Sequence, residues 1–218
     1  PRLLARLNKS SLYKLTVISA PAGFGKTTLL SEWANQCRFP VIWLSLNESD
    51  NDAAQFWMYM MVGLRGLSDQ PENVELTPSL NPQDSVLAQI TNLISTISCE
   101  FVLILDDYHS IQNEQIHSTL ASLLDYLPAH MHICIVSRTR PPLPLARLRA
   151  YRQLYELRPP DIVFTLQELE TFLTHASGKE PPPGKAQAIK TYTDGWIAIV
   201  HLVSIWLQEQ QDGWEALG

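Results

Sequence analysis

Residues 15–28, which read LTVISAPAGFGKTT, decide the fold of this chain. The segment opens with a continuous apolar run, Leu15 to Ile18, which is typical of a strand buried on both faces of a sheet. A turn with two glycines follows at Ala20 to Thr28, and a helical run extends from Leu29 to Cys37. A strand, a glycine-containing turn and a helix, in this order, predict the first unit of a parallel α/β domain.

The turn matches the phosphate-binding pattern GxxxxGK[ST], with Ala20 in place of the first glycine. Backbone N–H groups of such a turn, and of the helix that it opens, point inward at an anion, and the helix dipole adds to the attraction. We expect Lys26 to reach the β- and γ-phosphates of ATP and the Thr27 hydroxyl to bind Mg²⁺. The residues expected to bind the nucleotide here are Ala22, Gly23, Phe24, Gly25, Lys26, Thr27 and Thr28. A bare Gly-Lys-Thr in an ordinary loop is the alternative.

Two adjacent acids follow a second apolar run, Phe101 to Leu105. Carboxylates at the end of a parallel strand lie in the crevice where open α/β sheets bind ligands. We expect Asp106 to hold Mg²⁺ through water, and Asp107 to orient or deprotonate an attacking water molecule. Acids at a strand end also occur in simple turns. The run continues to His109, for which the sequence offers no chemical task, and we expect this histidine to cap backbone groups.

An arginine follows the run Ile133 to Val136 directly, in the segment Ser137 to Arg140. Arg138 lies near the γ-phosphate if this strand is placed between the other two, and a bidentate contact there distinguishes a triphosphate from a diphosphate. The bland alternative is a solvated arginine beyond a strand end. Candidate catalytic residues are therefore Asp107, Lys26 and Arg138.

The remaining pattern predicts a P-loop NTPase with a parallel five-stranded sheet between helices. A further apolar run lies at Val41 to Leu44, and an edge strand is expected near Tyr155 to Leu157. Residues 1–160 would form this ATP-binding domain. Residues 161–218 would form a small helical appendage, the truncated start of a helical or winged-helix-type subdomain, with a capping box at Thr165 and Glu168.

Composition excludes several other classes. A formal net charge of −6 argues against a domain that grips a polyanion. The three cysteines are too far apart for a disulfide framework or a paired zinc site, which favours a reducing cytoplasm. No apolar run is long enough to span a membrane, and the first residues lack the charged-then-apolar layout expected of a signal peptide. Because the chain begins with Pro1 and ends at Gly218, we expect a fragment of a longer protein.

Several motifs, taken in their order along the chain, resemble those of the ATP-binding domain of STAND-class signalling ATPases. Among these ATPases, they resemble the large MalT-like regulators of the LuxR family. The resemblance covers nearly the whole chain and is more specific than the phosphate-binding loop alone. It rests on residues 1–4, 20–28, 45–52, 105–109, 137–138, 141–143, 145–149 and 194–196.

This resemblance implies a nucleotide-controlled switch. ADP would hold the protein at rest, while ATP and an unknown inducer would permit self-association. The inducer-sensing and DNA-binding regions would lie further along the chain. The resemblance also implies that Arg2 and the following short helix close over the adenine, with Gly195 and Trp196 approaching from the appendage. Related domains often have a proline just after this glycine, where this chain has Trp196 and Ile197. Trp196 as simple helix core is the alternative.

Three functions remain open from the sequence. The leading hypothesis is a regulatory ATPase whose slow, Mg²⁺-dependent hydrolysis resets the switch. A small-molecule kinase that uses the same loop is an alternative from a different class, although a pair of acids suits water activation better. The third is a module that binds nucleotide without turnover. The arginines at 138, 140, 147, 149, 152 and 158 would contact a neighbouring protomer or the nucleotide, or form a solvated face.

Overall fold

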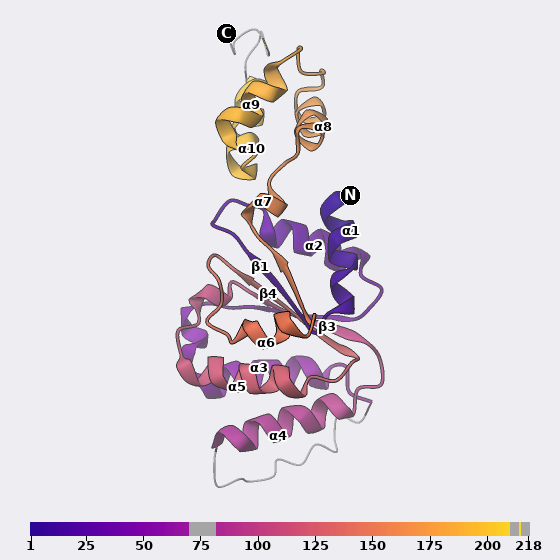
Figure 1. Ribbon diagram of the computed structural model, residues 1–218, viewed down its shortest axis with the longest axis vertical. Coiled ribbons are helices and arrows are strands. Elements are labelled where there is room, and N and C mark those ends of the chain that lie inside the picture. Colours follow the sequence, from indigo (N-terminus) through magenta and orange to yellow (C-terminus); the bar gives the residue numbers. More distant parts are fainter. Residues whose placement is uncertain (70–81, 210–213, 215–218) are drawn as a thin grey trace. The chain divides into compact units, whose positions relative to one another are not determined.

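The computed structural model describes residues 1–69, 82–209 and 214, and a parallel sheet of five strands lies at its centre (Figure 1). The strand order is β2-β3-β4-β1-β5, and every neighbouring pair is parallel. The strands are β1 (Leu15–Ser19), β2 (Val41–Ser45), β3 (Phe101–Asp106), β4 (Met131–Ser137) and β5 (Leu154–Leu157).

The predicted fold class is confirmed. All four apolar runs and the edge strand form strands, each one to three residues longer than the run that predicted it. All six residues of β3 are buried, as a central strand that is covered on both faces requires. Each of the strands β1 to β4 ends in a polar residue, and hydrophobicity alone does not show that this residue belongs to the strand.

Helices cover both faces of the sheet. On one face are α3 (Ala53–Arg65), α5 (Glu114–Tyr126) and α6 (Leu145–Ala150), and α4 (Pro82–Ser95) packs against α3 and α5. On the opposite face lie α1 (Arg2–Asn8) and α2 (Lys26–Gln36) (Figure 1). The indole N–H of Trp33 on α2 donates to the side-chain oxygen of Asn8, 3.0 Å away, and ties α2 to α1.

The main core lies between the sheet and the first of these helical layers. Odd-numbered residues of β1, β3 and β4, such as Val17, Leu103 and Ile133, face this side, because successive side chains of a strand point to opposite faces. Phe56 and Trp57 of α3 add a perpendicular pair of rings with centroids 4.9 Å apart. This large apolar interior fixes the sheet on which the candidate site is built.

Strand register brings the polar strand ends to one edge of the sheet. Ser45 pairs with Asp106, and Ser19 pairs with Ser137. Three short 3-10 helices complete the connections: η1 (Ser10–Leu12), η2 (Glu48–Asn51) after β2, and η3 (Tyr108–Ser110) after β3. Because β4 lies between β1 and β3, the condition on which the expectation for Arg138 depended is met.

The chain divides into two compact units. One contains residues 1–19 and 27–157, and the other contains residues 20–26 and 158–218. In the second unit, α8 (Leu166–Ser177), α9 (Lys185–Thr193) and α10 (Ile197–Glu209) enclose a small core of their own, preceded by α7 (Pro159–Ile162). The phosphate-binding loop is thus grouped with the C-terminal helices. The domain boundary expected between residues 160 and 161 stays a prediction.

The helix start expected at Thr165 is present. The Thr165 hydroxyl accepts from the backbone N–H of Glu168 at 3.2 Å, and a Glu168 carboxylate oxygen accepts from the backbone N–H of Thr165 at 2.9 Å. Gly178 ends α8 in the left-handed conformation, with φ 71°. Within the residues that the structure describes, none of the helices is long and apolar enough to cross a membrane.

Candidate functional site

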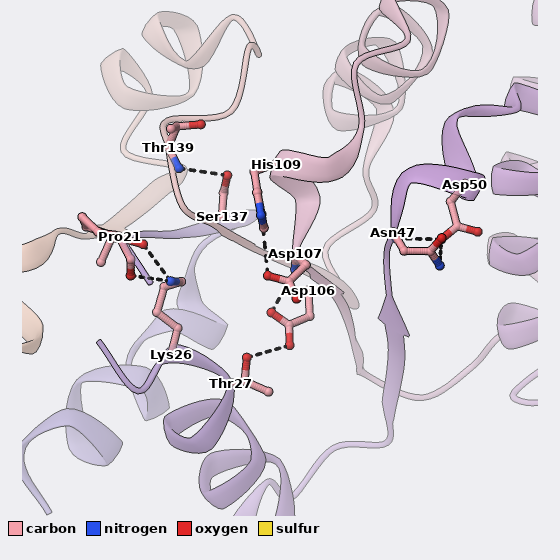
Figure 2. Close-up of polar contacts among 11 residues, drawn as sticks. Pro21, Lys26, Thr27, Asn47, Asp50, Asp106, Asp107, His109, Ser137 and Thr139 are labelled. Atoms are coloured by element: carbon pink, nitrogen blue, oxygen red, sulfur yellow. Dashed lines mark hydrogen bonds and ion pairs between the residues drawn. The ribbon is translucent and has the colours of Figure 1, made fainter. Parts of the chain in front are cut away.

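The carboxylate of Asp106 is held at both oxygens where β3 ends. The Thr27 hydroxyl, in the first turn of α2, donates to Oδ2 of Asp106 at 3.1 Å, and the Asp107 backbone N–H donates to Oδ1 at 2.9 Å (Figure 2). Asp106 is only 3% exposed. On the neighbouring strand, burial and then the charge of Asp106 raise the pKa of the Cys134 thiol. The fixed carboxylate therefore places negative charge at the strand end that faces Thr27.

This pair suits a magnesium ion that is bound together with a nucleotide. Within residues 1–69, 82–209 and 214, no group of three His, Cys, Asp or Glu side chains is placed to hold a metal ion by itself. Mg²⁺ is commonly held by one or two protein oxygens together with substrate phosphates and water. The hydroxyl of Thr27 and the carboxylate of Asp106 are hard oxygen ligands of this kind. They fit the ion in a shared site with phosphate.

Asp107 stands in an unusual backbone conformation. Its φ of 55° and ψ of 35° place it in the left-handed region, which an aspartate tolerates better than most residues. Its side chain is 48% exposed, and its Oδ1 lies 3.6 Å from Nδ1 of His109 (Figure 2). The backbone turn thus separates two adjacent acids, one fixed and buried and the other directed toward solvent. His109 thus has a carboxylate as a neighbour, and its expected role in capping backbone groups stays a prediction.

A set of asparagine contacts holds the loop after β3, and sequence reasoning missed it. The Asn51 amide donates to the Ser110 carbonyl at 2.8 Å, while its side-chain oxygen accepts from the backbone N–H of Gln112 at 2.6 Å. The Asn113 side chain donates back to the Asn51 carbonyl at 2.8 Å. Asn47 opens η2 with a capping box to Asp50 (Figure 2). The 45–52 motif therefore steadies the segment that carries Asp107.

Next to this loop, Tyr108 and His117 form a buried pair. Oη of Tyr108 lies 2.7 Å from Nδ1 of His117, and both side chains are buried. Burial raises the pKa of the Tyr108 phenol. Burial also lowers the pKa of His117, opposed in part by the charge of Glu114. Neutral histidine is thus the form that the fold accommodates.

We expect this pair to make stability depend on pH. Because the pKa of His117 is lower in the folded state than its unfolded value of about 6.5, the unfolded chain binds the proton first as the pH falls. The stability that neutral His117 contributes to the fold is therefore fully present above the unfolded pKa. It is lost as the pH falls from the unfolded pKa through the lower folded pKa. Denaturant titrations of the parent and of His117→Gln should therefore show a stability difference that narrows from pH 7.5 to pH 5. A constant difference would contradict this prediction.

Residues Ala20 to Lys26 of the phosphate-binding loop belong to the second compact unit. The Lys26 ammonium donates to the carbonyls of Ala20 and Pro21, at 2.7 and 2.9 Å (Figure 2). Gly23 and Gly25 have φ values of 78° and 67°, in the left-handed region where glycine pays no steric cost. Ala20 is not among the residues with positive φ. Alanine at the first position of the motif therefore needs no special backbone conformation, which accounts for the departure from the usual glycine.

Trp196 lies against this loop. Its ring stacks on Phe24, with centroids 5.9 Å apart and planes inclined by 27°. The structure thus brings together the loop and the tryptophan that the resemblance singled out, while contact with adenine stays a prediction. Ile197 and Ala198 also contact the loop, and sequence reasoning missed them. The available signal in the sequence was Gly195, which lies between the end of one helix and the start of the next.

The functional roles of all the predicted site residues, including those described above, stay predictions. Arg138 is exposed at the end of β4, Thr28 is exposed on α2, and Arg2 lies half-buried in the first turn of α1. Arg147 and Arg149 of the arginine group form ion pairs within the described chain. Arg147 contacts Asp125 at 2.9 Å, and Arg149 holds both carboxylate oxygens of Glu156.

Comparison with known proteins identifies relatives of this arrangement. The HTH-type transcriptional regulator MalT of Yersinia enterocolitica is 31% identical over 208 residues, which are 94% of this chain. The chain spans only 23% of that regulator's length.

Two solved structures share the fold. A signal transduction ATPase with numerous domains (STAND) and a tetratricopeptide repeat sensor, from Pyrococcus horikoshii, has a TM-score of 0.69 and 17% identity, over 94% of this chain and 29% of that one. A Walker-type ATPase of Pyrococcus abyssi has a TM-score of 0.58 and 14% identity, over 99% of this chain and 69% of its own.

The family model for the ATPase family associated with various cellular activities matches residues 16–158, the segment that extends from the second residue of β1 to just beyond β5. With the P-loop fold, the Thr27–Asp106 contact and this match, the chain belongs to the AAA family of ATPases.

Proposed function

We propose that this chain is the ATP-binding switch of a larger transcriptional regulator, with the state of the nucleotide controlling self-association. The contact between Thr27 and Asp106 carries the proposal, because it joins the magnesium-binding hydroxyl of the loop motif to the acid at the end of β3. The MalT relatives support the regulatory role. A net charge of −6 agrees with DNA binding by another part of such a protein.

Binding would use the chain's residues in distinct ways. The amides of residues 22–28 would surround the phosphates, and the Lys26 ammonium would exchange its loop carbonyls for β- and γ-phosphate oxygens. The hydroxyl of Thr27 and, through water, the carboxylate of Asp106 would hold Mg²⁺. When bound, that ion neutralises charge on the two terminal phosphates. Arg2 and Trp196 would lie on the adenine side.

Hydrolysis would be slow and would reset the switch. Asp107 supports turnover rather than binding alone, because its carboxylate is half-exposed and follows β3, whereas the adjacent Asp106 carboxylate is fixed by hydrogen bonds. It would orient or deprotonate the attacking water. In single-turnover assays with MgATP, the full-length protein should release inorganic phosphate without an added acceptor. Release that requires an added small-molecule acceptor would instead favour the kinase hypothesis.

The output would be conformation. A ligand shifts an equilibrium only by its differential affinity for the two states. Moving a protein from 1:99 to 99:1 takes about 5.5 kcal/mol. Contacts from Lys26, Mg²⁺ and Arg138 to a single γ-phosphate are a plausible source of much of that difference. ADP would favour the resting state, and ATP with an inducer would favour self-association.

We expect Arg138→Ala to weaken ATP binding by about tenfold and ADP binding much less, since one charge-assisted hydrogen bond contributes about 1.5–3 kcal/mol. Only the triphosphate carries the group that this arginine would contact. Isothermal titration with both nucleotides measures the two losses. Arg140→Ala is the matched control, because it removes the same charge two residues further along the same exposed loop. Equal losses for ATP and ADP in Arg138→Ala would remove its role as a sensor.

A further inference from the structure

The segment Asp194 to Ala198, which we call the α9–α10 turn, follows α9 and includes the first two residues of α10. It is hydrogen-bonded to the phosphate-binding loop. The backbone N–H of Ala198 donates to the carbonyl of Gly23 at 3.0 Å. Ala198 is the second residue of α10, and the first N–H groups of a helix have no partner within it. The loop carbonyl therefore satisfies a donor that the helix itself leaves open.

Side chains of the same turn fit closely around the two loop glycines. A Cβ at Gly23 would lie 2.8 Å from the Ala198 Cβ and 3.0 Å from Nε1 of Trp196. A Cβ at Gly25 would lie 3.2 Å from Cδ1 of Ile197. The left-handed backbone favours glycine at both positions, and at Gly23 the neighbouring turn also leaves no room for a Cβ. Loop and turn are shaped to each other.

Trp196 shows that this fit has a cost. Its Nε1 is buried and has no hydrogen-bond partner within the part of the chain that the structure describes. Burying an unpaired donor opposes folding. The stacking of Trp196 on Phe24 keeps the indole in this place nonetheless. The indole is therefore placed by its packing against the loop and not by a hydrogen bond of its own.

The hydrogen bond to Gly23 also fixes the direction of the next loop amide. The C=O and N–H of a trans peptide point in opposite directions, and no cis peptide occurs in the described chain. With the Gly23 carbonyl directed at Ala198, the N–H of Phe24 points away from α10. A glycine-rich loop binds an anion by directing consecutive amides toward it.

We propose that the α9–α10 turn is a positioning element of the nucleotide site. The N–H of Ala198 holds the Gly23–Phe24 peptide so that the Phe24 amide faces a bound phosphate. This inference rests on the nucleotide binding proposed above and adds the device that links it to α10. Because linkage is reciprocal, phosphate that stabilises this loop conformation also stabilises the attachment of α10. The nucleotide thereby acts on the attachment of α10 to the loop.

Substitution of Ala198 tests the hydrogen bond to Gly23. Proline lacks the N–H and is tolerated in the first turn of a helix, so Ala198→Pro deletes this one donor. Ala198→Gly keeps the donor and is the matched control. In the full-length protein with Mg²⁺, we expect Ala198→Pro to weaken the binding of both ATP and inorganic triphosphate by about tenfold. Ala198→Gly should weaken the binding of either ligand by less than about twofold.

Hydrogen exchange provides a second, independent readout in the unmodified protein. Inorganic triphosphate with Mg²⁺ should slow exchange of the Ala198 amide, even if the proline variant proves unstable. Equal affinity of the proline and glycine variants, a loss confined to ATP, or unchanged exchange at Ala198 would overturn the proposal. If those results came from a parent that binds ATP, the proposed function would stand. A parent that binds neither ligand would overturn both.

Discussion

Replacing Lys26 by alanine is expected to abolish tight ATP binding. The ammonium is buried to 8% exposure and is held at the loop by the carbonyls of Ala20 and Pro21, so its charge is screened less than that of a surface lysine. Hydrogen bonds to charged groups contribute about 1.5–3 kcal/mol each. Loss of two such bonds to phosphate should weaken binding at least about 100-fold, as isothermal titration with MgATP measures.

Lys179→Ala is the matched control for charge, because Lys179 is exposed and lies in the same compact unit as Lys26. We expect its affinity for ATP to stay close to that of the parent. Thermal unfolding without nucleotide should show that the Lys26→Ala protein is folded. An unchanged affinity in Lys26→Ala, or an equal loss in Lys179→Ala, would refute the assignment of the phosphate-binding loop.

Asp107→Asn is expected to lower the rate of hydrolysis by about 100-fold or more, since positioned acid–base groups typically contribute 10²–10⁴-fold. Asparagine removes the charge but tolerates the left-handed backbone that position 107 adopts, so the turn is retained. Binding of ATP should change little. Single-turnover release of phosphate measures the rate, and titration measures the affinity.

Asp125→Asn is a suitable comparison for this variant, because Asp125 is a half-exposed acid in an ion pair on α5. Its rate of hydrolysis should equal that of the parent. Background rates in both the parent and Asp107→Asn would leave only a module that binds nucleotide without turnover. The rate therefore decides between a slow ATPase and a binding switch.

The sheet was predictable because its signal is local. Continuous apolar runs mark strands that are buried on both faces, and four of the five strands contain one, while β5 was expected as an edge strand. The capping box at Thr165 was equally local. Boundaries were less exact: the helical run expected from Leu29 to Cys37 forms α2, which begins at Lys26 and ends at Gln36. Hydrophobic spacing identifies the buried face of a segment better than its last turn.

The contacts that shape the candidate site were not predictable, because they join distant segments. Nothing near Asn51 in the sequence indicates that it holds Ser110 and Gln112. The bond from Ala198 to Gly23 likewise spans most of the chain. Local patterns named Lys26, Thr27 and Asp106, but pairing Thr27 with Asp106 required the strand order and register.

A crystal structure of the protein with Mg²⁺ and a non-hydrolysable ATP analogue tests the central claim most directly. The account predicts the β- and γ-phosphates among the amides of the glycine-rich loop, with Nζ of Lys26 on their oxygens. It also predicts a metal ion bound by the Thr27 hydroxyl and, through water, by Asp106. Phosphates bound elsewhere, or a metal ion that touches neither residue, would contradict it.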